Sequence, residues 1–451
     1  MDAAFHTRRV TTLLLDTTAA GPGADRGNVE GTCEELVNIL PGSVYLPSSA
    51  NYSSLANENC PSPGAANINN GVLIDLANLN EIYYDAASGT VTVGTGNRWN
   101  AVYTALDTYN VTAVGGRVLD VGVGGFLLQS GLSYLSDLYG LGCDNVIEHE
   151  VVLANGSLVT ASADEHPDLH WALKCGANNF GIVTSFKIST YPIHLVWGGF
   201  KFYSPDQLPA LYAAMAEYQA APNKDPYANV MLQAFTTNAT DGAVLGIVYL
   251  KPEANPATFA PFYSIPTTSD TTRIQALTEM MGAQFVPDIP RIDWFATIFL
   301  PDAGLYQAIN NITTSATNLA AIESLTAGSM TIGLQPISAS LVLAGQDRGG
   351  NVFGLPAVNQ TWFVLDSGWW LPSEDRPGHH ATLDIRESIW DAAVERGLEV
   401  EYIFANDASY SQAVLQSYGS ENVAKMKDVQ ARYDPQMVFQ RLVPGGFKLG
   451  L

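Results

Sequence analysis

The chain has 451 residues, 47% hydrophobic and only 14% charged, so it can bury a large core, and a chain of this size usually forms two domains. Acidic residues outnumber basic ones by 44 to 21, and the formal net charge of −23 argues against nucleic acid and anionic membranes as partners. No apolar run approaches the length of a membrane span. The four cysteines lack C-x-x-C spacing, so we expect no metal site.

The N-terminal region shows few signs of folded structure. Residues 1–32 are small, polar and glycine-containing, and we expect a disordered tail there. A short helix is predicted over residues 33–40. Two interpretations of the cysteines are open: either Cys33 and Cys60 pair as a disulfide, or all four thiols are separate. Cys143 lies in an apolar stretch, which indicates a small core residue.

The signals for cellular location conflict. Low charge favours a secretory history, and so do six Asn-x-Ser/Thr sequons, at Asn51, Asn110, Asn155, Asn238, Asn311 and Asn359. Against this, Arg8 and Arg9 are followed by only a short apolar patch, which makes a weak signal peptide. The sequence therefore leaves the location open.

Two strands and a helix are predicted before residue 107. Residues 72–76 form the first strand, and residues 90–94 alternate between polar and apolar as a second strand does. Asn97 is expected to cap a helix whose apolar residues recur at helical spacing. We expect these residues in the core rather than against a ligand: Trp99, Val102, Tyr103 and Leu106.

Residues 115–155 form an unusually glycine-rich stretch. Its first part holds Gly115, Gly116, Gly122, Gly124, Gly125 and Gly131. Glycine lets the backbone turn tightly and approach a ligand without a Cβ in the way. Successive backbone N–H groups in such a loop can form a concavity that binds phosphate. The alternative is a glycine-rich turn between buried strands.

A hairpin, a helix and a second glycine loop follow. The hairpin is predicted over residues 147–161, with Asn155-Gly156 as a type I′ turn. Pro167 lies near the first position of a short helix. Residues 175–186, Cys-Gly-Ala-Asn-Asn-Phe-Gly-Ile-Val-Thr-Ser-Phe, form a second glycine loop that runs into a strand.

The character of the chain changes near Leu195. An amphipathic helix begins at Ser204-Pro205 with an apolar stripe formed by Leu208, Leu211, Tyr212, Met215 and Tyr218. Strands are predicted at residues 230–234, 243–250, 294–300, 329–334 and 361–365, and a helix at about residues 381–396 with Leu383, Ile389 and Trp390 inward. This pattern is typical of an antiparallel sheet with helices on one side, the α+β class.

The order of these segments resembles the flavin domain of the vanillyl-alcohol oxidase and p-cresol methylhydroxylase (PCMH) family, and most closely its fungal berberine-bridge-enzyme-like branch. The two glycine loops carry the resemblance, together with residues 402–408, 417–429 and 433–448 near the C-terminus. It covers about residues 33–449. It implies a split, PCMH-type FAD-binding domain over residues 33–194, a substrate domain over residues 195–400, and a segment, residues 401–451, that returns to the FAD domain.

The resemblance also implies an activity. Family members transfer a hydride from a substrate C–H to the flavin N5, and dioxygen then reoxidises the flavin. It thus implies an FAD-dependent oxidoreductase acting on a small molecule, namely an alcohol, a sugar or a secondary metabolite. The implied cofactor contacts are Gly115, Gly116, Val121, Gly122, Gly124, Gly125, Asn145, Gly181, Val183 and Asn406.

A catalytic base is harder to assign from the sequence. Tyr402 and Asp407 are the adopted candidates, and Asp366 is a third, because each is near the end of a predicted strand that faces the expected site. Each also has a purely structural interpretation. Trp369 and Trp370 either line the substrate pocket or pack in the core.

The chain departs from the family pattern at Cys60-Pro61. A strand–helix–strand unit of about 30 residues is missing there. In the family it ends in a Gly-Gly-His loop whose histidine bonds covalently to the flavin. None of the seven histidines has this context, and Val118 occupies the place of a second attachment cysteine. FAD is therefore expected to bind non-covalently.

Two alternatives stay open. A flavin-free or inactive family member would follow if the missing strands leave sheet edges unpaired and a gap in the core. A non-enzymatic secreted glycoprotein would fit the sequons and the acidity. A nicotinamide-binding domain is disfavoured, because no predicted strand ends in a complete G-x-G-x-x-G turn.

Overall fold

The computed structural model describes residues 12–16, 71–222, 224–237, 241–283, 289–443 and 445–450. Within them the strands form two large sheets and one pair. The predicted helix over residues 33–40, the question of Cys33 and Cys60, and the departure at Cys60-Pro61 lie outside the described residues.

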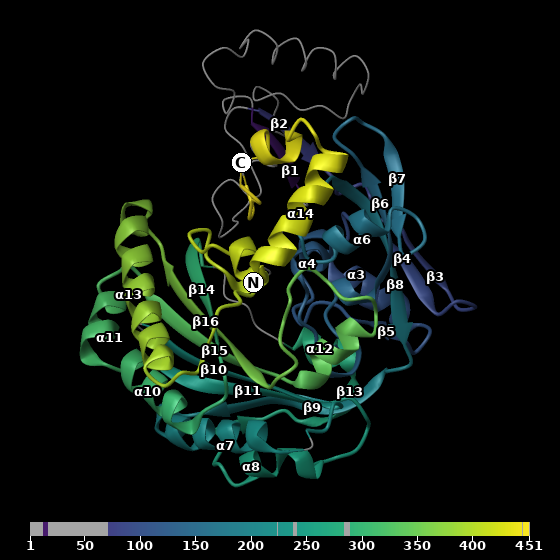
Figure 1. The fold of residues 1–451 in the computed structure, drawn as a ribbon. Coiled ribbons are helices and arrows are strands. Elements are labelled where there is room, and N and C mark those ends of the chain that lie inside the picture. The colour runs from purple at the N-terminus through teal and green to yellow at the C-terminus, as the bar shows by residue number, and fades with distance from the viewer. Residues whose placement is uncertain are drawn as a thin grey trace, which may run out of the picture.

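One of these sheets has six strands and the other has nine. We call the six-stranded sheet and the helices packed on it the small-sheet unit, and the nine-stranded sheet the large sheet (Figure 1). Its strands are ordered β3 (Ile82–Asp85), β4 (Thr90–Gly94), β8 (Ile182–Tyr191), β6 (Val146–Val152) and β7 (Leu158–Ser162), with β5 (Thr112–Ala113) beside β8. The predicted hairpin is confirmed as β6–β7. Its turn is not type I′, because Gly156 has a positive φ of 81° and Asn155 does not. The Asn155 side chain instead accepts hydrogen bonds from Ser157.

Helices α3 (Trp99–Asp107), α4 (Val123–Gln129), α5 (Ser136–Tyr139) and α6 (Pro167–Leu173) belong to the same unit. The core assignment of Trp99 and its helical neighbours is confirmed, since each is at most 2% exposed. The predicted cap is wrong: Arg98 is the N-cap residue of α3. The amide of Asn97 donates to the carbonyls of Gly94 and Glu81, so it ties the end of β4 rather than the helix.

One part of the N-terminal tail is ordered into a strand. Thr12–Asp16 forms β1, which pairs antiparallel with β2 (Gly71–Asp75). The expectation of disorder over residues 1–32 is therefore wrong for these five residues. A short apolar run is compatible with a strand wherever a partner edge is present, and β2 supplies that edge.

The large sheet is antiparallel and continuous. Its order is β12 (Ser269–Asp270), β9 (Leu195–Tyr203), β11 (Asp241–Tyr249), β10 (Ala228–Thr237), β15 (Ser329–Ile337), β16 (Gln360–Trp369), β14 (Arg291–Phe299) and β17 (Glu399–Val400), with β13 (Arg273–Ala276) also paired to β9. All five strands predicted after residue 195 are confirmed, with ends that differ from the predicted ones by at most four residues.

The two faces of the large sheet have different partners (Figure 1). One face packs in a core with helices α7 (Leu208–Ala220), α10 (Ala303–Thr313) and α13 (Asp375–Val394) and includes Leu232, Leu334 and Leu365. On the other face, Ala296, Ile298 and Trp362 belong to the core shared with the small-sheet unit. We call this second face the inner face.

Several helices were not predicted from the sequence: α8 (Ala260–Tyr263), α9 (Leu277–Gly282), α10, α11 (Ala316–Glu323), α12 (Ala339–Gln346), α14 (Ser420–Tyr433) and α15 (Val438–Arg441). The stripe of α7 is confirmed, as all five of its residues are buried. In α13, Ile385 and Ile389 point inward, whereas Leu383 and Trp390 are only partly buried.

Among the described helices, none combines the length and apolar character that a membrane span requires.

A buried ion pair joins the two units. Lys224, in the connection between α7 and β10, lies with its Nζ 2.9 Å from Asp137 Oδ2 of α5. The two side chains are 8% and 2% exposed. Asp137 Oδ1 also accepts from the backbone N–H of Ser338, which precedes α12. The carboxylate of Asp137 thus depends on partners from the large-sheet side.

Replacing Lys224 by Met should lower the free energy of unfolding by about 3–5 kcal/mol, because the carboxylate of Asp137 would remain buried without its cation. The matched control is Arg273→Met, whose pair with Glu279 is more than half exposed on both sides and should cost less than about 1 kcal/mol. Denaturant unfolding of both variants measures the difference. Equal losses would show that the Lys224–Asp137 pair does not hold the units together.

Candidate active site

A chain of polar contacts crosses from the small-sheet unit to the inner face of the large sheet. The guanidinium of Arg117, from the first glycine-rich stretch, donates to Gln335 Oε1 on β15. Gln335 Nε2 in turn donates to Asp407 Oδ2 at 2.7 Å. Burial raises the pKa of Asp407, and the hydrogen bond from Gln335 and the charge of Arg117 oppose that rise. Three segments distant in sequence therefore meet at one point.

The residue before Asp407 makes a second connection. Asn406 Oδ1 accepts from the Ser130 hydroxyl at 2.8 Å and from the Gly131 N–H at 3.1 Å. Ser130 is fully buried and has a φ of 135°, a conformation that non-glycine residues rarely adopt. The C-terminal segment thus binds the end of α4 through Asn406 and the large sheet through Asp407.

Asp366 lies on the inner face in the middle of β16. It pairs across the strands with Trp294 on β14 and Thr331 on β15. Its Oδ1 is buried and has no hydrogen-bond partner within the described part of the chain. Burial raises the pKa of Asp366 well above its usual value, and the negative charges of Asp407 and Asp293 add to this rise. A carboxyl group with a free oxygen and a raised pKa is typical of functional sites.

Tyr402 lies in an aromatic cluster with Phe353, Trp362 and Tyr418, at ring-centroid distances of 5.0 to 5.7 Å. The residue is 4% exposed and its hydroxyl has no hydrogen-bond partner among the described residues. Burial raises the pKa of Tyr402 well above 10, which disfavours the phenolate that a base requires. These surroundings favour a packing role.

A second acidic group near this site was missed by sequence reasoning. Asp293, at the start of β14, contacts His379 Nδ1 through one oxygen and accepts from the Ser409 hydroxyl at 3.1 Å through the other. His379 also stacks on Tyr410, with ring centroids 5.3 Å apart. Burial raises the pKa of Asp293, although the hydrogen bond with His379 lowers it. Neither His379 nor Asp293 lies in a sequence motif that would have identified it as a site residue.

The first glycine stretch divides into two parts with different roles. A Cβ on Gly115 or Gly116 would lie within 3 Å of the Trp99 ring, so these glycines allow the chain to pack on that ring. Further along, the stretch is helical rather than looped, since Gly122 is the N-cap of α4 and Gly124 and Gly125 are in its first turn. A Cβ on Gly125 would meet nothing within 4 Å, and the preceding Val121 is 37% exposed. The open surface is therefore at the start of α4.

Three other predicted cofactor contacts are occupied by the chain itself. The Asn145 amide donates to the carbonyls of Tyr139 and Leu141 and accepts from the Tyr191 hydroxyl. A Cβ on Gly181 would collide with Val151, and Val183 is 2% exposed in the core. The side chains of Asn145 and Val183 and the backbone at Gly181 are thus used for contacts within the small-sheet unit.

The two glycine loops lie next to one another. The N–H of Ala177 donates to the carbonyl of Leu128 at the end of α4. Cys143 is a buried core residue, as predicted, but it forms a disulfide with Cys175 with a Cα–Cα distance of 5.9 Å, so the interpretation of four separate thiols is wrong. The bond joins residues 32 positions apart, which spacing alone does not reveal.

The two tryptophans considered for the lining of the substrate pocket, Trp369 and Trp370, differ in their exposure. Trp369 is buried and donates from its indole N–H to Asp375, whereas Trp370 is 56% exposed.

In the part of the chain that the structure describes, no cluster of three or more His, Cys, Asp or Glu side chains could hold a metal ion.

Comparisons with known proteins agree with this architecture. A FAD binding domain family matches residues 58–162. The bifunctional solanapyrone synthase of Alternaria solani is 37% identical over 385 residues, which are 85% of this chain and 74% of that protein. A FAD-dependent monooxygenase of Arthrobotrys oligospora is 35% identical over 387 residues, 83% of this chain and 73% of its own.

Solved structures show the same fold. The 6-hydroxy-D-nicotine oxidase of Arthrobacter nicotinovorans superimposes with a TM-score of 0.72 at 18% identity and covers 89% of this chain and 97% of its own. A carbohydrate oxidase of Microdochium nivale gives a TM-score of 0.68 at 18% identity over 91% of this chain and 99% of its own. This chain belongs to a family of fungal FAD-dependent oxidoreductases, its fold is that of the PCMH-type and berberine-bridge-enzyme-like oxidases, and its cofactor is FAD.

Proposed function

We propose that this protein oxidises a small hydroxyl-bearing molecule, an alcohol or a sugar, at a site between the start of α4 and the inner face of the large sheet. The observation that carries the proposal is the buried, unpartnered oxygen of Asp366 on that face. The named activities of a carbohydrate oxidase and a xylooligosaccharide oxidase with the same fold support the substrate class.

The backbone at the start of α4 suits a flavin, because Gly125 leaves open space where a side chain would stand. We assign the flavin contacts to Val121, Gly122, Gly124 and Gly125, with Asn406 at the border of the site. Gly115, Gly116, Asn145, Gly181 and Val183 then support this surface from behind through their packing and hydrogen bonds. When bound, FAD supplies the acceptor for the hydride that leaves the substrate carbon.

Oxidation of an alcohol to a carbonyl releases a hydride from carbon and a proton from oxygen. We assign the proton to Asp366, whose free Oδ1 can accept a hydrogen bond from the substrate hydroxyl and then take its proton. Asp407 is a positioning residue, because Gln335, itself bonded to Arg117, holds its carboxylate, and the charge of Asp407 acts on Asp366. Tyr402 is assigned to packing.

Asp366→Asn should lower kcat about 100-fold or more, because the amide keeps the shape of the side chain and cannot accept the proton. The assay is flavin reduction and hydrogen peroxide formation by FAD-loaded protein with a panel of alcohols and sugars. FAD content and melting temperature should stay at the wild-type values. The matched control is Asp384→Asn, on the exposed side of α13, which should leave kcat unchanged.

Two results would overturn the proposal. Wild-type turnover by Asp366→Asn would exclude Asp366 as the proton acceptor. A purified protein that shows no flavin absorption and does not take up added FAD would favour the flavin-free family member instead.

The pH dependence of the rate gives a separate prediction. Because Asp407 is among the charges that raise the pKa of Asp366, Asp407→Asn should lower that pKa. A base acts only when it is ionised, so the rising limb of the kcat/KM profile should move to lower pH in this variant. A limb that stays in place or moves to higher pH would contradict the assignment, and Asp384→Asn again serves as the control.

A further inference from the structure

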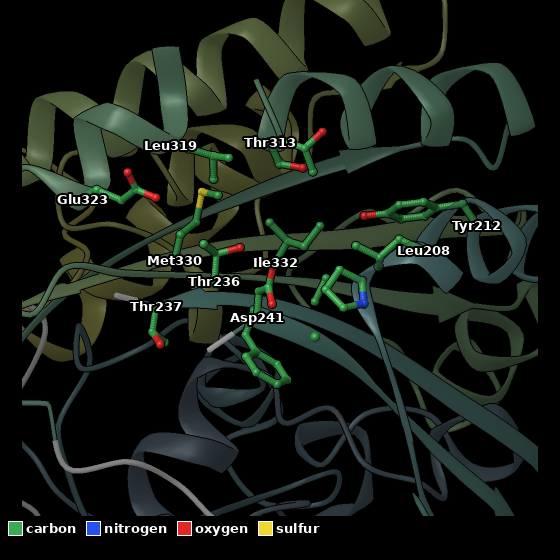
Figure 2. A pocket seen from close by; sticks show the side chains of 15 residues that line it. Leu208, Tyr212, Thr236, Thr237, Asp241, Thr313, Leu319, Glu323, Met330 and Ile332 are labelled. Carbon is green, nitrogen blue, oxygen red and sulfur yellow. The ribbon is translucent and has the colours of Figure 1, made fainter. Parts of the chain in front are cut away.

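A pocket of about 470 Å³ is shown in Figure 2. Its residues Met330 and Ile332 belong to the helix-facing core, so the pocket lies on the opposite face of the large sheet from Asp366. It opens between strands β10, β11 and β15 and helices α7, α10 and α11. Ala234, Met330 and Ile332 form an apolar floor, and Leu208 and Leu319 contribute to its walls. A cavity of this size, with an apolar floor and polar groups around it, can hold a small organic molecule.

One buried polar group in this pocket lacks a partner. Tyr212 is 2% exposed, and its hydroxyl makes no hydrogen bond with any described residue. In Figure 2 this hydroxyl points toward the middle of the pocket, on the side of Thr313 and Ile332. The neighbouring Tyr306 behaves in the ordinary way, since its hydroxyl bonds to Thr361 and Gln219. Buried hydroxyls are normally paired, so Tyr212 indicates a missing hydrogen-bond partner.

The charge at the mouth of the pocket is negative. Asp241 and Glu323 are both exposed lining residues, and no Lys, Arg or His lines the pocket among the described residues. The chain as a whole carries a net charge of −23. An anionic ligand would therefore be repelled, and a cationic one attracted.

We propose that this pocket is a binding site for a small amphipathic amine. The apolar body rests on the floor of β10 and β15, an oxygen or nitrogen acceptor in the body takes the hydrogen bond from Tyr212, and the protonated amine lies at the carboxylates of Asp241 and Glu323. The site is separate from the oxidation site, because the two lie on opposite faces of one sheet, and it does not depend on the proposed oxidation.

The probe is 4-(4-methoxyphenyl)butylamine, which carries an ether oxygen, an apolar body and an amine. Isothermal titration calorimetry with the FAD-loaded full chain should give one site per chain. The amine should bind at least tenfold more tightly than the carboxylate of the same skeleton, with the matching alcohol in between. Binding of the carboxylate as tightly as the amine, or of none of the three, would overturn the proposal.

Variants locate the probe. Tyr212→Phe should weaken amine binding about fivefold to tenfold while leaving the melting temperature of the free protein unchanged or higher, because the lost hydroxyl had no partner. Glu323→Gln should weaken the amine and not the alcohol. The matched control is Glu217→Gln, an exposed carboxylate on α7 outside the pocket, which should change neither. Thr236→Phe should narrow the pocket and remove binding; unchanged affinity in both Tyr212→Phe and Thr236→Phe would place the amine elsewhere.

Discussion

Two consecutive residues, Asn406 and Asp407, hold the two halves of the site together. Asn406 accepts hydrogen bonds from Ser130 and Gly131 at the end of α4, and Asp407 accepts one from Gln335 on the large sheet. Gln335 is in turn bonded to Arg117 of the first glycine stretch. The short 3₁₀ turn Ala405–Asp407 is therefore the point at which the C-terminal segment, the small-sheet unit and the inner face meet.

The large sheet separates two environments. Its helix-facing side is a hydrophobic core with Leu232, Leu334 and Leu365, and at its edge lies the pocket of Tyr212. Its inner side carries Gln335 and Asp366 among apolar residues. Since side chains alternate along a strand, one strand such as β15 can place Ile332 in the pocket and Gln335 at the oxidation site. The two proposed small-molecule sites therefore lie on opposite faces of one sheet and do not overlap.

Much of the fold could be predicted from local patterns. The β6–β7 hairpin, the stripe of α7 and the five long strands follow from period and turn residues. The glycines were informative, but their roles could not be separated in the sequence: Gly115 is required by the Trp99 ring, whereas Gly125 borders open space. The Trp99 ring excludes a side chain at Gly115, whereas at Gly125 only the proposed flavin would need the open space.

The parts of the fold and the site that were not predicted depend on contacts between segments distant in sequence. A local sequence pattern does not indicate such contacts. The Cys143–Cys175 disulfide and the Arg117–Gln335 bond, 218 positions apart, are of this kind. Strand β1 needed the edge of β2 to form, and helices α11 and α12 are only eight residues long and weakly amphipathic. Asp366 and Asp407 were candidates from the sequence, and Gln335, a polar residue at an inner-face position of an apolar strand, is a further signal that could have indicated the site.

The most direct test of this arrangement is hydrogen–deuterium exchange with and without FAD. If the flavin binds at the start of α4 beside Asn406, peptides covering residues 120–131 and 403–409 should exchange more slowly together when FAD is present, because the Gly131 N–H and the turn at residue 406 are linked. Helix α7, on the far side of the large sheet, should be unchanged. Slower exchange in α7 alone, or no change at residues 403–409 while FAD is bound, would contradict the account.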